Sequence, residues 1–359
     1  MWELLLIGIT TVLFLLPLVP ALQEWRLQRD IIPLNIIQSH AGHTRHFSDT
    51  FRIFIQNEIS ALSGQTQSSD SPKNYCLIEE NDTFKPSQDE RQDQSTQRIL
   101  FACGTLTLPD NFSFPREIYS KKTVVGMGGN HLRAILAEDK LIIGSRSTVL
   151  RWAHAHTIHI DSDCHLIGRL SAVEEITLEA GCIFTRIHAP YVKFGTHVSL
   201  SHDEVIKENI SINVDDLIPH QMACGDNKDN RWISEGDLEL PENEIFCGDI
   251  VARGNVIIRR GARIIGSVKA NGTLHVEPFA TITGSLISTK QLILAQSCVV
   301  GGPVVSEQRI NMDTGVVVGT VTTLTTLSAP VIQIVSGCII YGTVWARQQG
   351  VVLSAGKTA

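Results

Sequence analysis

The chain has 359 residues and carries 37 acidic and 30 basic side chains, which gives a formal net charge of −7. No block of basic residues dominates it, so nucleic acid is not expected as a partner. Hydrophobic residues make up 43% of the chain and aromatic residues only 6%, which excludes a disordered protein and favours a core of small β-branched side chains. The cysteines are too sparse for a disulfide framework, and none stands in a CxxC or CxxH pair that would begin a zinc site.

Residues 1–23 are predicted to form a transmembrane anchor. The stretch from Trp2 to Leu22 carries a single charge, Glu3 at its edge, and a helix of this length can cross a bilayer core of about 30 Å. Arginines follow the span, so the positive-inside rule places the C-terminal bulk of the chain in the cytoplasm. The alternative is a cleaved signal peptide, because the sequence Val19-Pro20-Ala21 resembles a cleavage site.

The juxtamembrane segment, residues 24–62, is predicted to contain a short amphipathic helix. Its apolar residues recur at helical spacing, and they are Phe47, Phe51, Phe54, Ile55, Ile59 and Leu62. We expect this stripe to pack on the folded domain or on a second copy, with the membrane surface as the alternative. Residues 63–98 are polar and rich in Ser, Gln, Asp and Glu, a composition typical of a flexible linker.

From about residue 99 the chain repeats with a period of about 18 residues, which is typical of a solenoid. Glycines mark the clearest turns, and they are Gly248, Gly266, Gly284, Gly302 and Gly319. Two residues after each corner stands an apolar residue, in the series Ile250, Val268, Leu286, Val304, Val321 and Val344. Each turn holds three pairs of inward positions two residues apart, which indicates three short strands per turn. The pattern therefore predicts an all-β fold, a triangular β-helix.

One inward column of the predicted β-helix requires small side chains. It is the position just before the third apolar pair of each turn, and its members are Cys164, Cys182, Ala262, Ala280, Cys298, Gly315 and Cys338. A free cysteine behaves as a small hydrophobic residue in such a place. We therefore interpret these cysteines as core residues, with a redox pair or metal site as the alternative, and their reduced state favours the cytoplasm.

The solenoid is predicted to consist of two tandem halves, residues 99–200 and 230–359, joined by a linker or insertion at 201–229. The motif that begins at Gly104 returns at Gly236, and the corners that follow keep the same offset. A β-helix exposes apolar cross-section and unpaired strand edges at its ends unless a cap covers them. The C-terminal end is apolar up to Leu353 and carries no long cap, so we expect it to be free for self-association.

The segment from Gly236 through Gly272 resembles the bactofilin family of bacterial cytoskeletal proteins, and the similarity is good over about 230–325 and weaker over 104–200. The resemblance implies a right-handed β-helix that polymerises end to end without nucleotide or other cofactor. It also implies a scaffold on the inner face of the bacterial inner membrane that recruits envelope or cell-wall proteins for cell shape. Ordinary members have one short β-helix, whereas this sequence predicts two halves and a membrane anchor.

Other functions compete with this interpretation. A hexapeptide-repeat acyltransferase would share the period, and His154, His156, His159 and His165 fall in one turn, but their register does not bring them together. No paired carboxylates, nucleophile elbow or cofactor motif occurs, so we expect no enzyme, no catalytic residue and no metal site. A possible basic contact patch on the outer surface consists of Arg253, Arg259, Arg260 and Arg263. A membrane-anchored binding module that does not polymerise is the second hypothesis.

Overall fold

The computed structural model describes His46–Ser63 (side chains to residue 57), residues 75–78, 81–195 and 231–356, and the isolated residues Trp2, Leu6, Leu16 and Val19. Contacts divide the chain into two units, Met1–Thr44 and Arg45–Ala359, and only the second is described as a fold. None of the helices described is both long and apolar enough to span a membrane. Apart from its isolated residues, the predicted span from Trp2 to Leu22 lies outside the described part, as do residues 64–74 and the predicted linker or insertion at 201–229.

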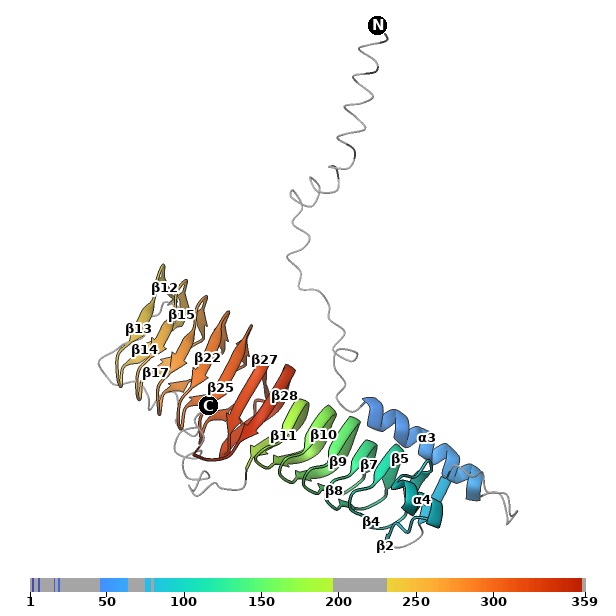
Figure 1. Cartoon of the computed structure of the whole chain (residues 1–359). Helices are drawn as coiled ribbons and strands as arrows, with labels where there is room; N and C mark the ends of the chain where they lie inside the picture. The colour runs from blue at the N-terminus through green and yellow to red at the C-terminus, as the bar shows by residue number, and fades with distance from the viewer. Residues whose placement is uncertain are drawn as a thin grey trace. The chain divides into compact units, whose positions relative to one another are not determined.

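The second unit is an all-β solenoid of about 12 turns, and its described part also contains two helices (Figure 1). The first series of parallel strands is β1 (Tyr75–Ile78), β2 (Asp82–Thr83), β3 (Ile99–Ala102), β4 (Leu106–Leu108), β5 (Ser113–Ser120), β6 (Val124–Gly126), β7 (His131–Ala137), β8 (Lys140–Ile143), β9 (Thr148–Ile160), β10 (His165–Leu178) and β11 (Ile183–Phe194). We call it the N-terminal stack. Its helices are α3 (His46–Ser63) and α4 (Gln88–Asp93).

A second series, the C-terminal stack, begins at β12 and is also parallel throughout. Its strands are β12 (Arg231–Ser234), β13 (Leu238–Leu240), β14 (Ile245–Cys247), β15 (Asp249–Ala252), β16 (Val256–Ile258), β17 (Arg263–Ile265), β18 (Val268–Ala270), β19 (Leu274–Val276), β20 (Thr281–Ile282), β21 (Leu286–Ser288), β22 (Gln291–Leu294), β23 (Val299–Val300), β24 (Val304–Ser306), β25 (Arg309–Met312), β26 (Val317–Val318), β27 (Thr325–Val335) and β28 (Cys338–Leu353).

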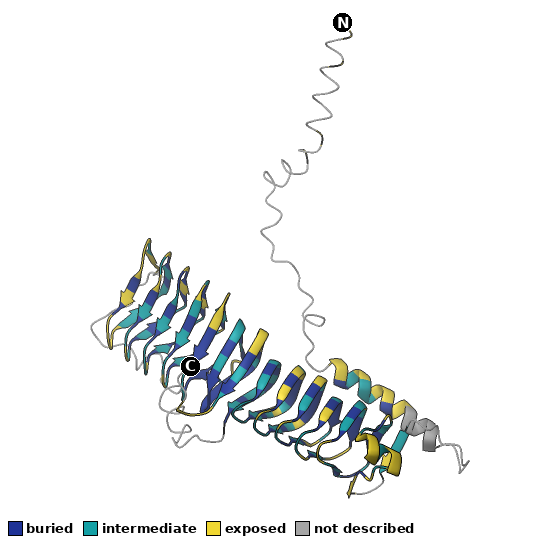
Figure 2. Cartoon of the chain, viewed as in Figure 1, coloured by how far each residue is buried: buried dark blue, intermediate teal, exposed yellow. Residues whose placement is uncertain are grey.

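The 18-residue period of the sequence is the register of the C-terminal stack. From β12 to β23 each strand pairs with the strand three positions later, and paired residues lie 18 positions apart, as Ile250 and Val268 do. Side chains alternate along each strand, and the residues that face inward are buried from β15 to β26. Figure 2 shows these buried positions recurring from turn to turn.

The register fails at one turn, where the prediction placed Val321 inside. Val321 is 72% exposed, and the buried residue on this face is Leu327, which pairs with Val304. The offset is 23 residues instead of 18 because five extra residues form the corner after Gly319. Beyond this corner β27 and β28 are long strands with one register shift between them. Val344, the predicted inward residue two positions after Gly342, is fully buried there.

Helix α3 packs on the outer surface of the N-terminal stack, as the first of the two predicted interpretations requires. Ile55 is 1% exposed and lies with Phe101, Tyr119 and Leu136, one from each of three successive turns. Arg52 adds a two-pronged ion pair, with Nε and Nη2 each donating to a carboxylate oxygen of Glu138 at 2.9 Å. The helix therefore covers the outward residues of β3, β5 and β7.

Part of the predicted flexible linker, residues 63–98, is ordered structure, so the first stack begins before residue 99. Strand β1 pairs with β3, β2 pairs with β4, and α4 takes the third side of this turn. A reciprocal capping box starts α4, with Ser87 and Glu90 bonding each other's backbone N–H. Polar composition indicated a linker because α4 buries none of its residues and shows no apolar stripe.

The two stacks meet through their C-terminal strands, which overturns the expectation of a free C-terminal end. Strand β28 pairs antiparallel with β11 through nine residue pairs, and His188 Nδ1 lies 2.8 Å from Thr343 Oγ1 across the junction. Each stack is parallel inside, so among the described strands antiparallel pairing occurs only at this junction. The apolar edge of the terminal strand is covered by β11, the last strand of the N-terminal stack.

The core consequently runs through both stacks without a break. One inward column can be followed across fourteen paired strands, and all but its first and last members are buried. In spatial order it is Cys76, Leu100, Ile118, Ile135, Ala153, Leu170, Ile187, Val344, Leu327, Val304, Leu286, Val268, Ile250 and Trp232.

Candidate functional site

The outer end of the C-terminal stack, formed by β12, β13 and β14, is the first candidate site. Within the described residues these strands pair only with β15, β16 and β17, so their other edge has no strand partner. Leu238 N–H donates to Asn255 C=O, and Leu240 C=O accepts from Arg259 N–H, so both groups bond to the residues that flank β16. Because backbone groups alternate along a strand, the N–H and C=O of Glu239 between them point to the unpaired side.

Aromatic side chains cover the core at this end. Trp232 continues the inward column beyond Ile250, and its ring centroid lies 5.6 Å from that of Phe246. Trp232 is nevertheless 41% exposed. Among the described residues, this end of the solenoid thus combines a row of backbone groups that have no strand partner with exposed apolar surface, which is the chemistry of a strand-pairing interface.

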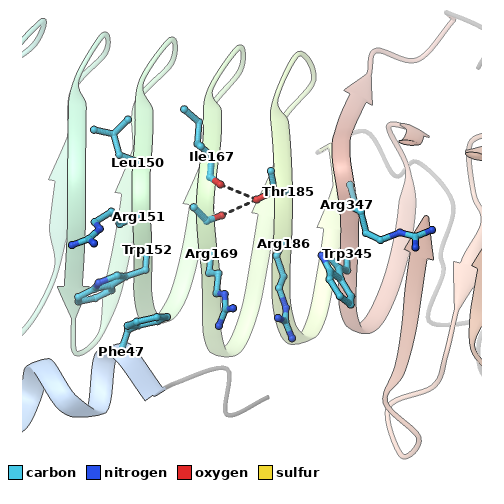
Figure 3. A pocket seen from close by; sticks show the side chains of 12 residues that line it. Phe47, Leu150, Arg151, Trp152, Ile167, Arg169, Thr185, Arg186, Trp345 and Arg347 are labelled. Atoms are coloured by element: carbon cyan, nitrogen blue, oxygen red, sulfur yellow. Dashed lines mark hydrogen bonds between the residues drawn. The ribbon is translucent and has the colours of Figure 1, made fainter. Parts of the chain in front are cut away.

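The second candidate site is a groove of about 540 Å³ beside the junction between the stacks. It is lined by residues of β9, β10, β11 and β28, with Phe47 of α3 at one edge (Figure 3). Four arginines line it, Arg151, Arg169, Arg186 and Arg347, and no acidic residue does. Arg169 and Arg186 form its centre, whereas Arg151 and Arg347 lie at its two ends and point away from that pair.

The strand register produces this centre. Trp152 pairs with Arg169, Arg169 with Arg186 and Arg186 with Trp345, so four neighbouring strands carry Trp, Arg, Arg and Trp at one level. The Arg169 guanidinium carbon lies 5.5 Å from the Phe47 ring centroid, and that of Arg186 lies 5.2 Å from the Trp345 centroid. Burial, together with the charge of Arg169, lowers the pKa of Arg186 from its ordinary value.

The small residues predicted for one inward column are all buried, Gly315 included. Four are cysteines, and their thiols bond carbonyl oxygens of the backbone, as Cys298 does to Glu277 O at 3.1 Å. Burial raises the pKa of Cys298 and Cys338 to about 12. A hydrogen bond with Cys164 and burial also raise the pKa of Cys182. Cys182, Cys298 and Cys338 are therefore poor nucleophiles, whereas the hydrogen bond with Cys182 lowers the pKa of Cys164.

The four histidines of one turn have separate environments. His154 is buried with Nδ1 at 2.8 Å from Ser171 Oγ, while the Nε2 atoms of His156 and His159 each lie 3.1 Å from a carboxylate oxygen, of Glu174 and Asp161 respectively. His165 is exposed. Across the described part of the chain no three His, Cys, Asp or Glu side chains are grouped as metal ligands would be.

The predicted basic patch does not present four unpaired charges. Arg253 pairs with Glu235 at 2.8 Å, and Arg259 pairs with both Glu239 at 2.7 Å and Glu277 at 2.6 Å. Arg260 lies over the Phe279 ring, 4.9 Å from its centroid. Neighbouring turns thus supply carboxylates that neutralise two of the four arginines of the predicted patch.

Sequence reasoning missed the arginine groove, although a signal for it exists. Trp152, Arg169 and Arg186 follow one another at intervals of 17 residues, which is one turn in this part of the solenoid. The contribution of Trp345 had no such signal, because it depends on the antiparallel junction. Comparison of the chain with family models, curated proteins and solved structures gives no match.

Proposed function

We propose that the protein is a non-enzymatic scaffold that self-associates through the outer end of its C-terminal stack. The observation that carries the proposal is the edge formed by β12, β13 and β14, which has no strand partner among the described residues and exposes Trp232 beside it. An unpaired edge of this kind is a template for a strand of a second copy. No nucleotide or other cofactor is needed for such pairing.

The β11–β28 junction supports the proposal, because it is an end-to-end contact of the required kind within one chain. Two solenoid ends meet there in antiparallel register and bury Ile187 and Val344 between neighbouring strands. An antiparallel contact between identical ends would relate two copies by a two-fold axis, the commonest symmetry of homo-oligomers. Growth beyond a dimer would require the β1 and β2 end, where only one edge of each strand is paired among the described residues.

The wider biological role follows the resemblance of residues 230–325 to the bactofilin family. On this proposal the solenoid is right-handed and triangular and arose by duplication, and residues 1–23 anchor it in a bacterial inner membrane with its bulk in the cytoplasm. Its partners would be further copies of itself and envelope or cell-wall proteins that determine cell shape. The arginine groove favours a second candidate function, an anchored binding module that does not polymerise.

A matched pair of substitutions at Glu239 tests the proposal. Glu239→Pro removes an outward N–H from the unpaired edge, and proline is tolerated on an edge strand. Glu239→Ala removes the same carboxylate from Arg259, which keeps Glu277, but retains the N–H. We expect sedimentation velocity of residues 45–359 to show dimers or larger species for the wild type and Glu239→Ala, and monomers for Glu239→Pro. Three proteins that all sediment as monomers would overturn the proposal.

A further inference from the structure

The arrangement of Arg169 and Arg186 is electrostatically unfavourable without a ligand. They are directly opposite on neighbouring parallel strands, which lie about 4.8 Å apart. Both side chains extend in the same direction between Phe47 and Trp345 (Figure 3). Like charges directly opposite each other in a sheet are destabilising. A favourable interaction of this arginine pair with another group must offset the electrostatic cost.

No carboxylate of the described chain offsets it. None of the arginines in the groove forms an ion pair with a described acidic residue. Elsewhere on the N-terminal stack, the half-buried Arg52, Arg98 and Arg133 pair with Glu138, Glu90 and Glu117. The groove therefore differs from its surroundings in holding cations whose counter-charge does not come from neighbouring turns.

The aromatic residues leave the hydrogen-bonding groups of these arginines available. A guanidinium that lies over an aromatic ring uses its face for that contact, and its N–H donors stay in its own plane. Two guanidinium groups side by side can donate paired N–H groups to the oxygens of a tetrahedral dianion, because Arg binds phosphate through paired N–H donors. A cavity of about 540 Å³ is also within the size range of small-molecule sites.

We propose that this groove binds a phosphomonoester, with the phosphate held by Arg169 and Arg186 and the organic part lying against Trp345 or Phe47. Two cations at the centre match the two negative charges of a phosphomonoester better than the single charge of a carboxylate. The site is built by both stacks, since β10 and β11 carry the arginines and β28 carries Trp345. It does not depend on self-association of the chain.

Titration of the full-length protein in a non-ionic detergent tests the proposal, with phenyl phosphate, inorganic phosphate and a short-chain phosphatidic acid as probes. Calorimetry measures the affinity, and tryptophan fluorescence reports the groove because Trp345 is 43% exposed there. We expect phenyl phosphate to bind and to change the fluorescence. Tighter binding of phosphatidic acid would identify the phosphate as a lipid headgroup, and tighter binding of phenyl phosphate would identify a soluble ligand.

The variants decide whether binding occurs at the two arginines. We expect Arg169→Gln with Arg186→Gln to weaken binding at least about tenfold. The matched control, Arg253→Gln with Arg259→Gln, removes two arginines that already pair with glutamates and should leave the affinity unchanged. Arg186→Lys keeps the charge but loses the paired N–H donors of the guanidinium, so it should weaken binding. This variant tests the site even if the double variant fails to fold. Absence of binding at millimolar probe, or equal affinity in all variants, would overturn the proposal.

Discussion

Substitution of Gly350 by alanine should destabilise the junction between the two stacks. An added Cβ would lie 2.3 Å from Cε2 and 2.4 Å from Cζ of Phe184, where carbon atoms prefer about 3.5–4.0 Å. Phe184 is fully buried, and its ring centroid lies 5.9 Å from that of Phe194, so the ring has little space to move into. Overpacking of this kind costs about 1–3 kcal/mol.

Differential scanning calorimetry of residues 45–359 measures the effect. With an unfolding entropy of about 2.1 cal/mol/K per residue, a cost of about 1–3 kcal/mol corresponds to a fall in Tm of about 1.5–4.5 °C for a chain of this length. The matched control is Gly236→Ala, because an added Cβ there meets no atom within 4 Å. We expect the control to shift the free energy of unfolding by no more than about 0.5 kcal/mol.

A double-mutant cycle with Phe184→Leu shows whether the loss arises at the junction. Gly350 and Phe184 belong to different stacks, and they touch only if β28 pairs with β11. Leucine leaves room for the new methyl group, so the double variant should be more stable than the sum of the single effects predicts, by about 1 kcal/mol. Effects that add within about 0.3–0.5 kcal/mol would refute the antiparallel junction.

Two further predictions concern the N-terminal stack. Ile55→Asp should detach α3 from the stack, because it buries a charge against Phe101 and Tyr119. The control Ile53→Asp, at a position that is 60% exposed, should leave α3 in place. Limited proteolysis that cuts α3 equally in both variants would contradict this prediction. Burial raises the pKa of Glu90, but its bonds to Arg98, Thr96 and the Ser87 N–H outweigh burial and lower it to about 2. Because this pKa lies below the ordinary value of 4.5, the stabilisation is complete above about pH 4.5 and is lost as pH falls towards 2. The Tm difference between wild type and Glu90→Gln should therefore shrink over that interval, and a constant difference would contradict the assignment.

The repetitive part of the fold could be predicted because its signal is local. Between Gly248 and Val318 every turn has the same length, so the alternation of inward residues directly reports the strand register. The corner after Gly319 has five extra residues, and the same counting then selected the exposed Val321 in place of Leu327. Periodicity reports inward positions only while the turn length is constant.

Contacts between distant parts of the chain could not be predicted in this way. The pairing of β11 with β28 joins residues more than 140 positions apart, and the sequence of neither strand contains a pattern that indicates its partner. The C-terminal strand was therefore expected to be free, and the groove that Trp345 completes was not found. Polar residues surround strand β1 and helix α4, so composition predicts a linker there, although Ser87 and Glu90 form a recognisable capping box.

Electron microscopy of residues 45–359, without nucleotide and under reducing conditions, tests self-association most directly. The account predicts solenoids joined end to end through β12, β13 and β14, so that two copies related by a two-fold axis continue one stack of strands with a spacing of about 4.8 Å. Single solenoids at every concentration would contradict it, and particles that meet side by side would show that the unpaired edge is not the interface.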